Sequence, residues 1–333
     1  MSRPAPGTLV ELARLFLKLG TLGFGGPAAH IALMEDEVVR RRGWLSRERF
    51  LDLLGATNLI PGPNSTEMAI HVGSERAGWR GLVVAGACFI FPAFLIVLAC
   101  AWAYTRYGSL PAAEGLLRGV KPLIIAIVLQ ALWGLGRTAT RTRLLAAIGL
   151  VSLAAAAAGL HELAVIFGAG VVVALRAWAR SGAGQGPANA IAALPLGAAA
   201  LASTTTTAPF GLTPLFLVFL KIGSVLFGSG YVLLAFLRAD LVVRRGWLTE
   251  SQLLDAVAVG QVTPGPVFTT ATFVGYLLGG FRGAVVATVG IFLPAFVFVA
   301  LSGPLVPRIR RSPVAGAFLD GVNVASIALM ALV

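Results

Sequence analysis

Apolar runs of about twenty residues alternate with short polar connections along most of the 333-residue chain. A helix of about twenty apolar residues crosses the ~30 Å hydrocarbon layer of a bilayer, so this pattern predicts membrane-spanning helices. The runs cover residues 8–34, 50–73, 79–105, 115–135, 143–160 and 162–178 in the first half and 211–237, 252–279, 283–302 and 315–333 in the second. We therefore expect an all-α polytopic membrane protein.

Two stretches of the chain repeat one another 203 residues apart. FLKLG, FGG, RRGWLS and PGP follow in order within residues 16–63, and FLKIG, FGS, RRGWLT and PGP within residues 219–266. After a one-residue shift the match continues, with GWRG in the first half and GFRG in the second. Matched apolar segments interrupted by Gly and Pro are typical of transporters built from two repeats.

The repeats divide the chain into three parts. Residues 1–180 form a first transmembrane repeat, 181–208 a linker that could itself cross the membrane, and 209–333 a second repeat. The second copy lacks counterparts of 143–160 and 162–178, and its last apolar run, from Asn323 on, has only eleven residues, too few to span from there. We expect the second repeat to be incomplete at its C-terminal end.

The orientation of the second repeat depends on the linker. Six crossings followed by a non-crossing linker would give parallel repeats, whereas a seventh crossing would invert the second repeat. Inversion would place the matched RRGW loops, 41–44 and 244–247, on opposite faces, which the positive-inside rule disfavours. We favour inverted repeats, because a midplane site between inverted repeats is a common transporter plan. Parallel repeats stay open as the alternative.

Composition agrees with a membrane location and excludes several function classes. Apolar residues make up 57% of the chain and charged residues 12%, with a mean hydropathy of +0.87, whereas globular domains carry about 25% charged residues. The net charge of +12 comes from arginines in short loops, without the aromatic-interleaved basic stripe of a nucleic-acid binder. No metal-ligand cluster, Walker loop or nucleophile–base set is present, so we predict no metal, no cofactor and no enzyme.

Each Pro-Gly-Pro motif is predicted to break a helix that begins at a cap, Ser46 or Thr249. The helix-breaking residues are Pro61, Gly62 and Pro63 in the first repeat and Pro264, Gly265 and Pro266 in the second. A half-helix that restarts after the break exposes amide donors and the positive end of its dipole, which suit an oxyanion. The predicted substrate ligands in these first turns are Asn64, Ser65, Thr66, Thr269 and Thr270. A simple kink is the alternative.

Two lysines lie at matched positions inside apolar segments, six residues before the FGG and FGS motifs. A lysine in lipid is costly and by default functional, so Lys18 and Lys221 are predicted to bind a dianion. Snorkelling to the membrane surface is the alternative. The small residues that follow would let the backbone approach a ligand or another helix closely: Gly25, Gly26, Gly228 and Ser229.

Glu67 and His71 lie one helical turn apart just beyond the first Pro-Gly-Pro, where the second repeat has Thr270 and Val274. An acid at this place could carry a coupling proton, with His71 as its relay. The alternative is a structural pair near a membrane surface.

The motifs together resemble the chromate transporter (CHR) family of bacteria and archaea. FGGP at 24–27 and IPGPNSTEMA at 60–69 look like the family's N-terminal domain, and FGSGYVLLAFL at 227–237 and TPGPVFTTATFVGY at 263–276 look like its C-terminal domain. The resemblance covers residues 16–94 and 219–296. It implies a multi-pass protein of the cytoplasmic (inner) membrane that exports chromate, driven by the membrane potential or a proton gradient, and confers resistance. Sulfate is the implied look-alike substrate.

We expect one dianion to be held near the midplane between the two half-helix starts, with access alternating as one repeat rocks against the other. Uptake of sulfate or another tetrahedral oxyanion, and a passive anion channel, stay open because the same donors would serve them. A homodimer stays open as the oligomeric state.

Overall fold

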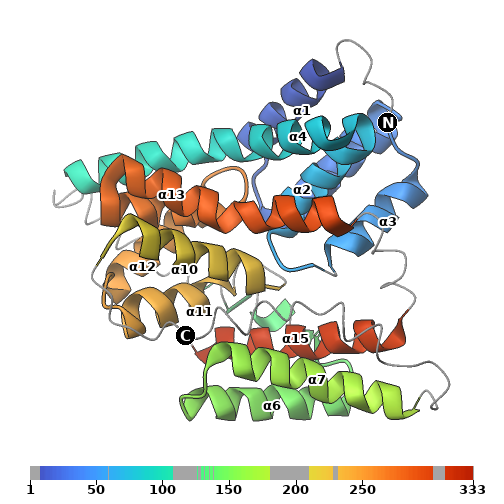
Figure 1. The fold of residues 1–333 in the computed structure, drawn as a ribbon, viewed down its shortest axis with the longest axis vertical. Helices are drawn as coiled ribbons and strands as arrows, with labels where there is room; N and C mark the ends of the chain where they lie inside the picture. Colours follow the sequence, from blue (N-terminus) through green and yellow to red (C-terminus); the bar gives the residue numbers. More distant parts are fainter. Residues whose placement is uncertain are drawn as a thin grey trace.

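The computed structural model describes residues 8–107 apart from Leu59, single positions between 126 and 138, and then 139–180, 210–227, 232–302 and 312–332. Every regular element in these ranges is a helix, as Figure 1 shows. Among them, four are long and apolar enough to cross a membrane: Asn64–Tyr107, Glu162–Arg180, Val267–Ser302 and Pro313–Leu332. The predicted linker, 181–208, and most of the segment 115–135 lie outside the described residues.

Residues 8–107 of the first repeat contain five helical elements where three apolar segments were expected. They are α1 (Thr8–Leu22), α2 (Gly26–Glu35), a π-helical continuation η1 (Asp36–Arg41), α3 (Arg47–Thr57) and α4 (Asn64–Tyr107). The prediction of one continuous segment over 8–34 was wrong, because Gly25 and Gly26 adopt φ of 98° and 77° and Pro27 follows. This left-handed backbone ends one helix and lets the next start in a new direction.

The second repeat follows the same order of elements. They are α10 (Leu212–Val225), α11 (Leu233–Leu237), η3 (Arg238–Arg244), α12 (Glu250–Val262), the 3₁₀ turn η4 (Val267–Thr269) and α13 (Thr270–Ser302). The predicted helix caps are confirmed: the Ser46 side chain accepts from the Arg49 amide, and Thr249 forms a capping box with Gln252.

The longest helix of each repeat folds back on itself as a hairpin. The reversal lies at Ala77 and Gly78 in α4 (φ −145° and 60°) and at Gly279 and Gly280 in α13 (φ −141° and 59°). Glycines allow the two arms to touch: a Cβ at Gly73 would meet the Gly81 carbonyl, and α13 has the same contact between Gly275 and Gly283. The two hairpins therefore match with an offset of 202 residues.

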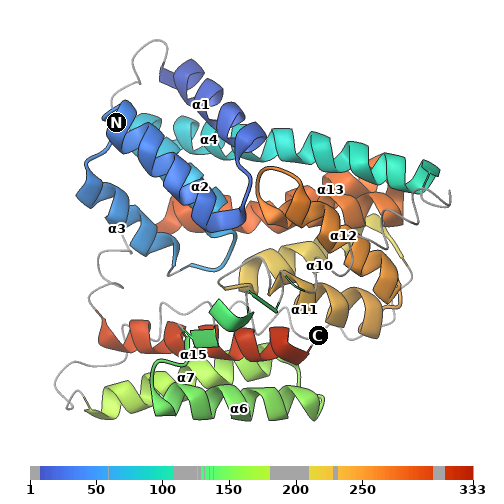
Figure 2. The same cartoon turned by 180° about the vertical axis from the view of Figure 1, so that it is seen from behind.

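The hairpins lie side by side at the centre of the two repeats (Figures 1 and 2). Each packs against the first helix of its own repeat, α1 on α4 and α10 on α13. Their second arms run in opposite directions, leftward for α4 and rightward for α13 in Figure 1. In agreement, Gly86, early in the second arm of α4, lies against the Phe296 ring, late in that of α13. The two hairpin turns therefore lie at opposite ends of the molecule.

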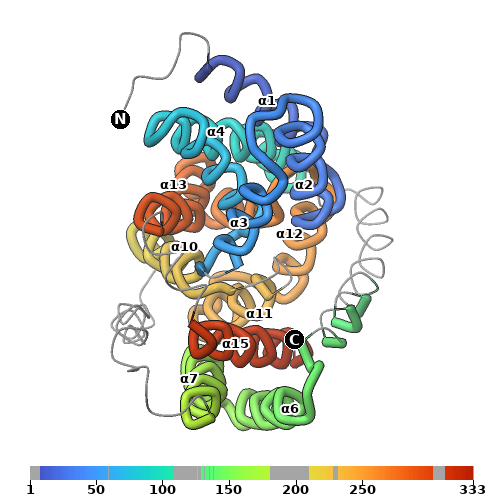
Figure 3. Tube along the Cα trace, turned by 90° about the vertical axis from the view of Figure 1, so that its right-hand side faces the viewer, coloured from blue at the N-terminus to red at the C-terminus, as the bar shows by residue number. Residues whose placement is uncertain are grey.

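A further layer joins the two repeats, with α15 (Pro313–Leu332) of the second packed on α6 (Arg143–Ala157) and α7 (Glu162–Arg180) of the first (Figure 3). Arg141 forms an ion pair with Asp320 at 2.6 Å, so this charge of α15 has a partner. The apolar segment predicted over 315–333 corresponds to α15, which runs through Asp320 and Asn323 for 20 residues and is long enough to cross a membrane.

The hairpin contact predicts a specific sensitivity to a single methyl group. We expect Gly73→Ala to lower the melting temperature in detergent by a few degrees, because overpacking against a backbone costs about 1–3 kcal/mol. Gly316→Ala is the matched control, since a Cβ at this helical glycine meets nothing within 4 Å. Equal melting temperatures for the two variants would contradict the hairpin packing.

Candidate functional site

The two Pro-Gly-Pro motifs form the turns between helices in both repeats. Pro61, Gly62 and Pro63 lie between the end of α3 and the start of α4, and residues 264–266 lie between α12 and η4. Gly62 has φ of 142° and Gly265 has φ of 91°, a region that side-chain-bearing residues rarely adopt. The glycine of each motif is therefore required by its backbone conformation.

Each turn is hydrogen-bonded to the other repeat, and the two bonds are equivalent. The Gly62 amide donates to the Leu226 carbonyl at 2.8 Å, and the Gly265 amide donates to the Gly23 carbonyl at 2.8 Å. Both donors and both acceptors are 203 residues apart, so each repeat gives and receives the same bond. This reciprocity is the sign of a pseudo-two-fold relation between the repeats.

Side-chain packing follows the same reciprocal pattern. A Cβ at Gly265 would lie 2.6 Å from the Cβ of Ala93 in α4, and one at Gly62 would lie 3.7 Å from that of Ala295 in α13. Ala93 and Ala295 are 202 residues apart, as expected for positions in the hairpins. The two turns, with the half-helices that follow them, therefore meet at one interface between the repeats, and we call this the turn site.

The two half-helix starts at the turn site differ in how their hydroxyl groups are used. Thr269 Oγ1 donates to the Pro266 carbonyl and Thr270 Oγ1 to the Val267 carbonyl, both at 2.8 Å. Thr66, the counterpart of Thr269, is fully buried, and its hydroxyl has no hydrogen-bond partner among the described residues. An unpaired buried hydroxyl is costly. The Thr66 hydroxyl can therefore donate to a ligand, whereas the hydroxyls of Thr269 and Thr270 already donate to the backbone.

The other two predicted ligands of the first repeat differ in solvent exposure. Ser65 is buried with 2% of its surface exposed, beside Thr66 in the first turn of α4. Asn64 lies toward the outside, where its side-chain amide donates to the Asn58 side chain at 2.9 Å. Ser65 and Thr66 therefore face the protein interior at the turn site, and Asn64 instead ties the start of α4 to the end of α3.

Glu67 is the most unusual side chain at the turn site. It is fully buried, and neither carboxylate oxygen has a hydrogen-bond partner among the described residues. One of these oxygens lies directly against Gly62, where a Cβ would collide with it. A buried acid without a partner is costly as a carboxylate, so it marks either a protonated group or a place where a ligand acts.

His71 lies one turn further along α4, with 5% of its surface exposed and an unpartnered Nε2. No direct hydrogen bond joins it to Glu67 among the described contacts. Its counterpart is Val274 at the 203-residue offset of the turns and Phe273 at the 202-residue offset of the hairpins. The conclusion that the second repeat is apolar here is unchanged, since Phe273 and Val274 are both buried.

Each of the two predicted lysines forms an ion pair with a carboxylate of its own repeat. Lys18 Nζ lies 2.8 Å from Glu37, and Lys221 Nζ lies 2.5 Å from Asp240. The first pair is half exposed at its lysine, whereas the second is buried, with 13% and 3% of the two side chains exposed. A lysine that binds an anion here must share its charge with this carboxylate or exchange partners.

Sequence reasoning missed the acidic partners of these lysines, although the repeat contained the signal. Glu37 and Asp240 are 203 residues apart, the same offset as the lysines. An arginine completes each group: Arg41 approaches Glu37 at 3.6 Å, and its counterpart Arg244 binds Asp240 at 2.9 Å. The repeat alone could therefore have predicted two equivalent ion-pair networks, because both the acids and the lysines recur at the same offset.

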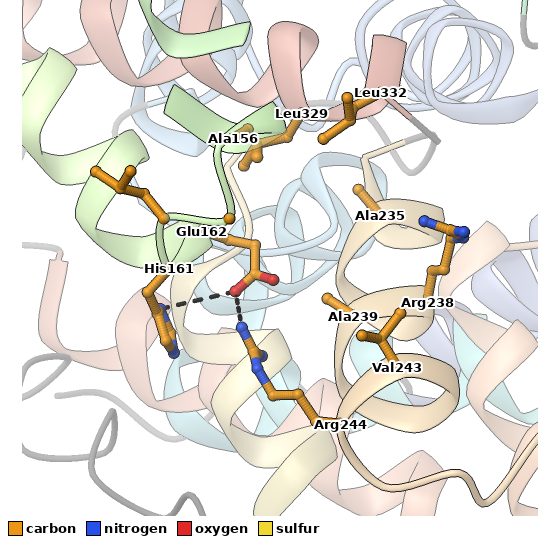
Figure 4. Close-up of a pocket in the computed structure, with 12 residues that line it drawn as sticks. Ala156, His161, Glu162, Ala235, Arg238, Ala239, Val243, Arg244, Leu329 and Leu332 are labelled. Carbon is orange, nitrogen blue, oxygen red and sulfur yellow. Dashed lines mark hydrogen bonds and ion pairs between the residues drawn. The ribbon is translucent and has the colours of Figure 1, made fainter. Parts of the chain in front are cut away.

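The second network extends to a hollow at the edge of α15. Arg244 also pairs with Glu162 at the start of α7, and this pair faces a cavity of about 340 Å³ together with Arg238 (Figure 4). Burial and the Arg244 guanidinium lower the pKa of the nearby His161, so its ring is neutral at pH 7. Arg238 is paired with Glu250 at 2.8 Å. The cations of this hollow are thus engaged with protein carboxylates.

A further buried acid joins the repeats away from the turns. The Tyr104 hydroxyl, near the end of α4, donates to Asp255 of α12 at 2.9 Å. Asp255 is 3% exposed, whereas its counterpart Asp52 lies at the surface. The repeats therefore share a backbone arrangement, whereas their polar side chains differ.

The remaining predicted residues fall outside the turn site or outside the described part of the chain. Gly25 and Gly26 form the turn between α1 and α2, beside the Gly23 carbonyl that receives the reciprocal bond. Gly228 and Ser229 lie outside the described residues. Within the described ranges, no group of three His, Cys, Asp or Glu side chains could hold a metal ion.

Comparisons with known proteins place the chain among transporters. The family model described as "Chromate transporter" matches residues 10–174 and 213–333. The chain is 37% identical to a chromate transport protein of Cupriavidus metallidurans over 96% of its own length and 80% of that protein. It is 35% identical to a probable chromate transport protein of Synechococcus elongatus (97% and 83%) and 26% identical to an uncharacterized transporter of Methanocaldococcus jannaschii (96% and 81%). No solved structure is detectably similar.

The reciprocal contact of the turns can be tested with glycine variants. We expect Gly265→Ala to destabilise the protein more than Gly246→Ala, and Ala93→Gly to recover part of that loss. Both glycines have positive φ, which costs alanine about 1–2 kcal/mol, but only the first adds a collision with Ala93. Melting in detergent measures the difference, and equal losses without rescue would contradict the interface.

Proposed function

The chain belongs to the chromate transporter family, and from this premise we propose that it is a secondary active transporter that exports chromate across the cytoplasmic membrane. Sulfate is proposed as a second substrate, because it is also a tetrahedral dianion. One observation carries the mechanism: the reciprocal bonds of Gly62 and Gly265 bring both half-helix starts to one interface between the repeats. No enzymatic activity is proposed.

The repeats are proposed to have inverted orientations in the membrane. Equivalent arms of α4 and α13 run antiparallel and belong to helices of spanning length, which supports inversion rather than a parallel arrangement. An odd number of crossings must then separate the repeats. A two-fold axis in the membrane plane between such repeats is a common basis for alternating access.

The Pro-Gly-Pro motifs are proposed to break the membrane helices near the midplane. The first arm of α4, residues 64–76, measures about 20 Å at 1.5 Å per residue, somewhat more than half of the ~30 Å hydrocarbon layer. Its outer end carries Arg76, Trp79 and Arg80, side chains typical of the membrane–water interface. An arm that ends at the interface places its start, and the turn site, near the middle.

We propose that the dianion binds between the two half-helix starts. The first amides of each half-helix, at residues 64–65 and 267–268, provide donors without a full charge, since they have no partner within the helix. The Ser65 and Thr66 hydroxyls add donors in the first repeat. Thr269 and Thr270 donate to their own backbone, so their proposed contribution is to shape the site through that hydrogen bonding.

Lys18 and Lys221 are proposed to supply positive charge through exchange of partners. Each lies five residues before a carbonyl that binds the opposite turn, Gly23 or Leu226, which supports a role near the turn site. An arriving dianion competes with Glu37 or Asp240 for the lysine. The freed carboxylate retains Arg41 or Arg244 as a partner, which lowers the cost of the exchange.

Glu67 is proposed to carry the coupling proton, and its charge determines the direction in which the proton moves relative to the anion. A carboxylate at the turn site would repel a dianion in a medium of low dielectric constant, so the anion binds more tightly when Glu67 is protonated. Proton and anion then move in the same direction. The complex carries one net negative charge, and the inside-negative membrane potential drives it outward. Oxyanion uptake and a passive channel remain the alternative functions.

The first test of function is transport by the purified protein in liposomes. We expect radiolabelled chromate to move toward the positive side of an imposed potential, to be competed by sulfate, and to move faster at the lower of two pH values. The Glu67→Gln variant should keep the response to potential and lose the response to pH. Flux that is passive and unchanged by pH in both proteins would favour the channel, and no flux of either anion would contradict the proposal.

The lysine assignment needs variants that avoid an orphaned carboxylate. We expect the double variants Lys18→Met/Glu37→Gln and Lys221→Met/Asp240→Asn to fold but to bind chromate about ten- to a hundredfold more weakly, because a hydrogen bond to a charged group contributes about 1.5–3 kcal/mol. Binding is measured by calorimetry and folding by melting. Wild-type affinity in both double variants would show that the lysines serve only their ion pairs.

A further inference from the structure

Three titratable side chains follow one another along the first arm of α4. Glu67 is fully buried at the turn, His71 is 5% exposed, and Glu75 is exposed at the outer end of the arm. Steps of four residues place them on one side of a helix, with neighbouring Cβ atoms about 5–6 Å apart. The series leads from the turn site to the end of the arm, over a rise of about 12 Å.

The inner two members of the series have polar atoms without partners. Both oxygens of Glu67 and Nε2 of His71 lack hydrogen-bond partners among the described residues. Buried polar atoms are usually satisfied, and two consecutive exceptions on one helix face need an explanation. Groups that exchange a proton cannot be permanently committed to other partners, so the exceptions fit a path along which a proton moves.

The second repeat lacks every member of the series. Thr270 occupies the position of Glu67 at the 203-residue offset of the turns, and Phe273 and Leu277 occupy those of His71 and Glu75 at the 202-residue offset of the hairpins. Thr270 donates to the Val267 carbonyl, so its hydroxyl proton is already in use. The backbones of the repeats match closely, and therefore the difference along this arm lies in the side chains.

The outer end of the series lies at a charged surface. Glu75 pairs with Arg49 of α3 at 2.6 Å, and the neighbouring Arg76 lies 3.7 Å from Glu11 of α1. The charged groups that act on His71 are Glu75 on its own helix and Arg49 on α3. With 32% of its side chain exposed, Glu75 can exchange protons with water.

We propose that Glu67, His71 and Glu75 form a path by which the coupling proton reaches the turn site from one membrane face only, the face of the α4 hairpin turn. This inference rests on the proposed coupling role of Glu67. Glu75 takes up a proton from water, His71 receives it on one ring nitrogen and releases one from the other, and Glu67 holds it. After the repeats have alternated, Glu67 releases this proton together with the anion to the water that enters the turn site from the opposite face. With no equivalent path in the second repeat, the proton enters from a single side.

The test compares two fluxes of the full chain in liposomes with a trapped pH indicator. One is exchange of labelled for unlabelled chromate at equal pH, which needs binding and alternation but no new proton. The other is net chromate movement with its accompanying proton. We expect Glu75→Gln and His71→Phe to lower the net, proton-linked flux by about tenfold or more while exchange stays within about twofold.

Two matched variants separate a proton path from a structural ion pair. Arg49→Gln breaks the same pair as Glu75→Gln but leaves the carboxylate, and Glu11→Gln removes another paired surface acid of this region. Both should keep the wild-type ratio of proton flux to exchange. An equal loss in Arg49→Gln and Glu75→Gln, or wild-type proton flux in Glu75→Gln, would overturn the path.

The Glu67→Gln variant distinguishes the failure of the path from the failure of the coupling. If it moves chromate without protons while Glu75→Gln behaves as wild type, the coupling role stands and only the path is wrong. If it moves protons with chromate as the wild type does, Glu67 is not the coupling acid and the path is overturned with it. Should Glu75→Gln lose exchange as well, Glu75→Asp, which keeps the acid, must restore both fluxes.

Discussion

The two backbone hydrogen bonds that cross between the repeats are the constraint on which the rest of this structure depends. A helix interrupted by Pro-Gly-Pro leaves polar backbone groups without partners, and in a membrane each such group costs several kcal/mol. Here the amide of Gly62 is satisfied by the carbonyl of Leu226, and that of Gly265 by the carbonyl of Gly23. The acceptors are themselves at the ends of α10 and α1. Each turn thus finds its hydrogen-bond acceptor in the opposite repeat.

Close approach of backbones is the condition that lets these bonds form. Gly20 lies against the Phe89 carbonyl and its counterpart Gly223 against that of Ile291, so α1 and α10 sit directly on the hairpins that carry the turns. Small residues at such contacts allow helices in lipid to gain packing without a hydrophobic driving force between them. Glycines at these positions therefore allow the close approach of helices within each repeat.

The sequence was a good guide to features that depend on local chemistry and a poor one to those that depend on tertiary contact. The caps at Ser46 and Thr249 follow from side-chain chemistry and were predicted. The end of α1 before Gly25 was missed, since an apolar run conceals a reversal that only left-handed glycines reveal. The pairing of Lys18 with Glu37 joins residues 19 apart, and no helical periodicity relates them. Likewise, the differing use of the Thr66 and Thr269 hydroxyls appears only once the turns are in place.

For the proposed transport cycle, a duplicated backbone with unequal side chains would let one chain combine alternating access with proton coupling. If equivalent elements exchange roles, two conformations of similar energy follow from the pseudo-symmetry, and access can alternate between the two sides. Perfect symmetry would make both directions equivalent and could not tie transport to a proton on one side. Glu67 opposite Thr270 breaks this equivalence at the turn site, where the proposed proton and dianion would affect each other most strongly. In the proposed cycle, the symmetry of the backbone therefore provides the movement, and the asymmetry of a few buried side chains ties it to a proton.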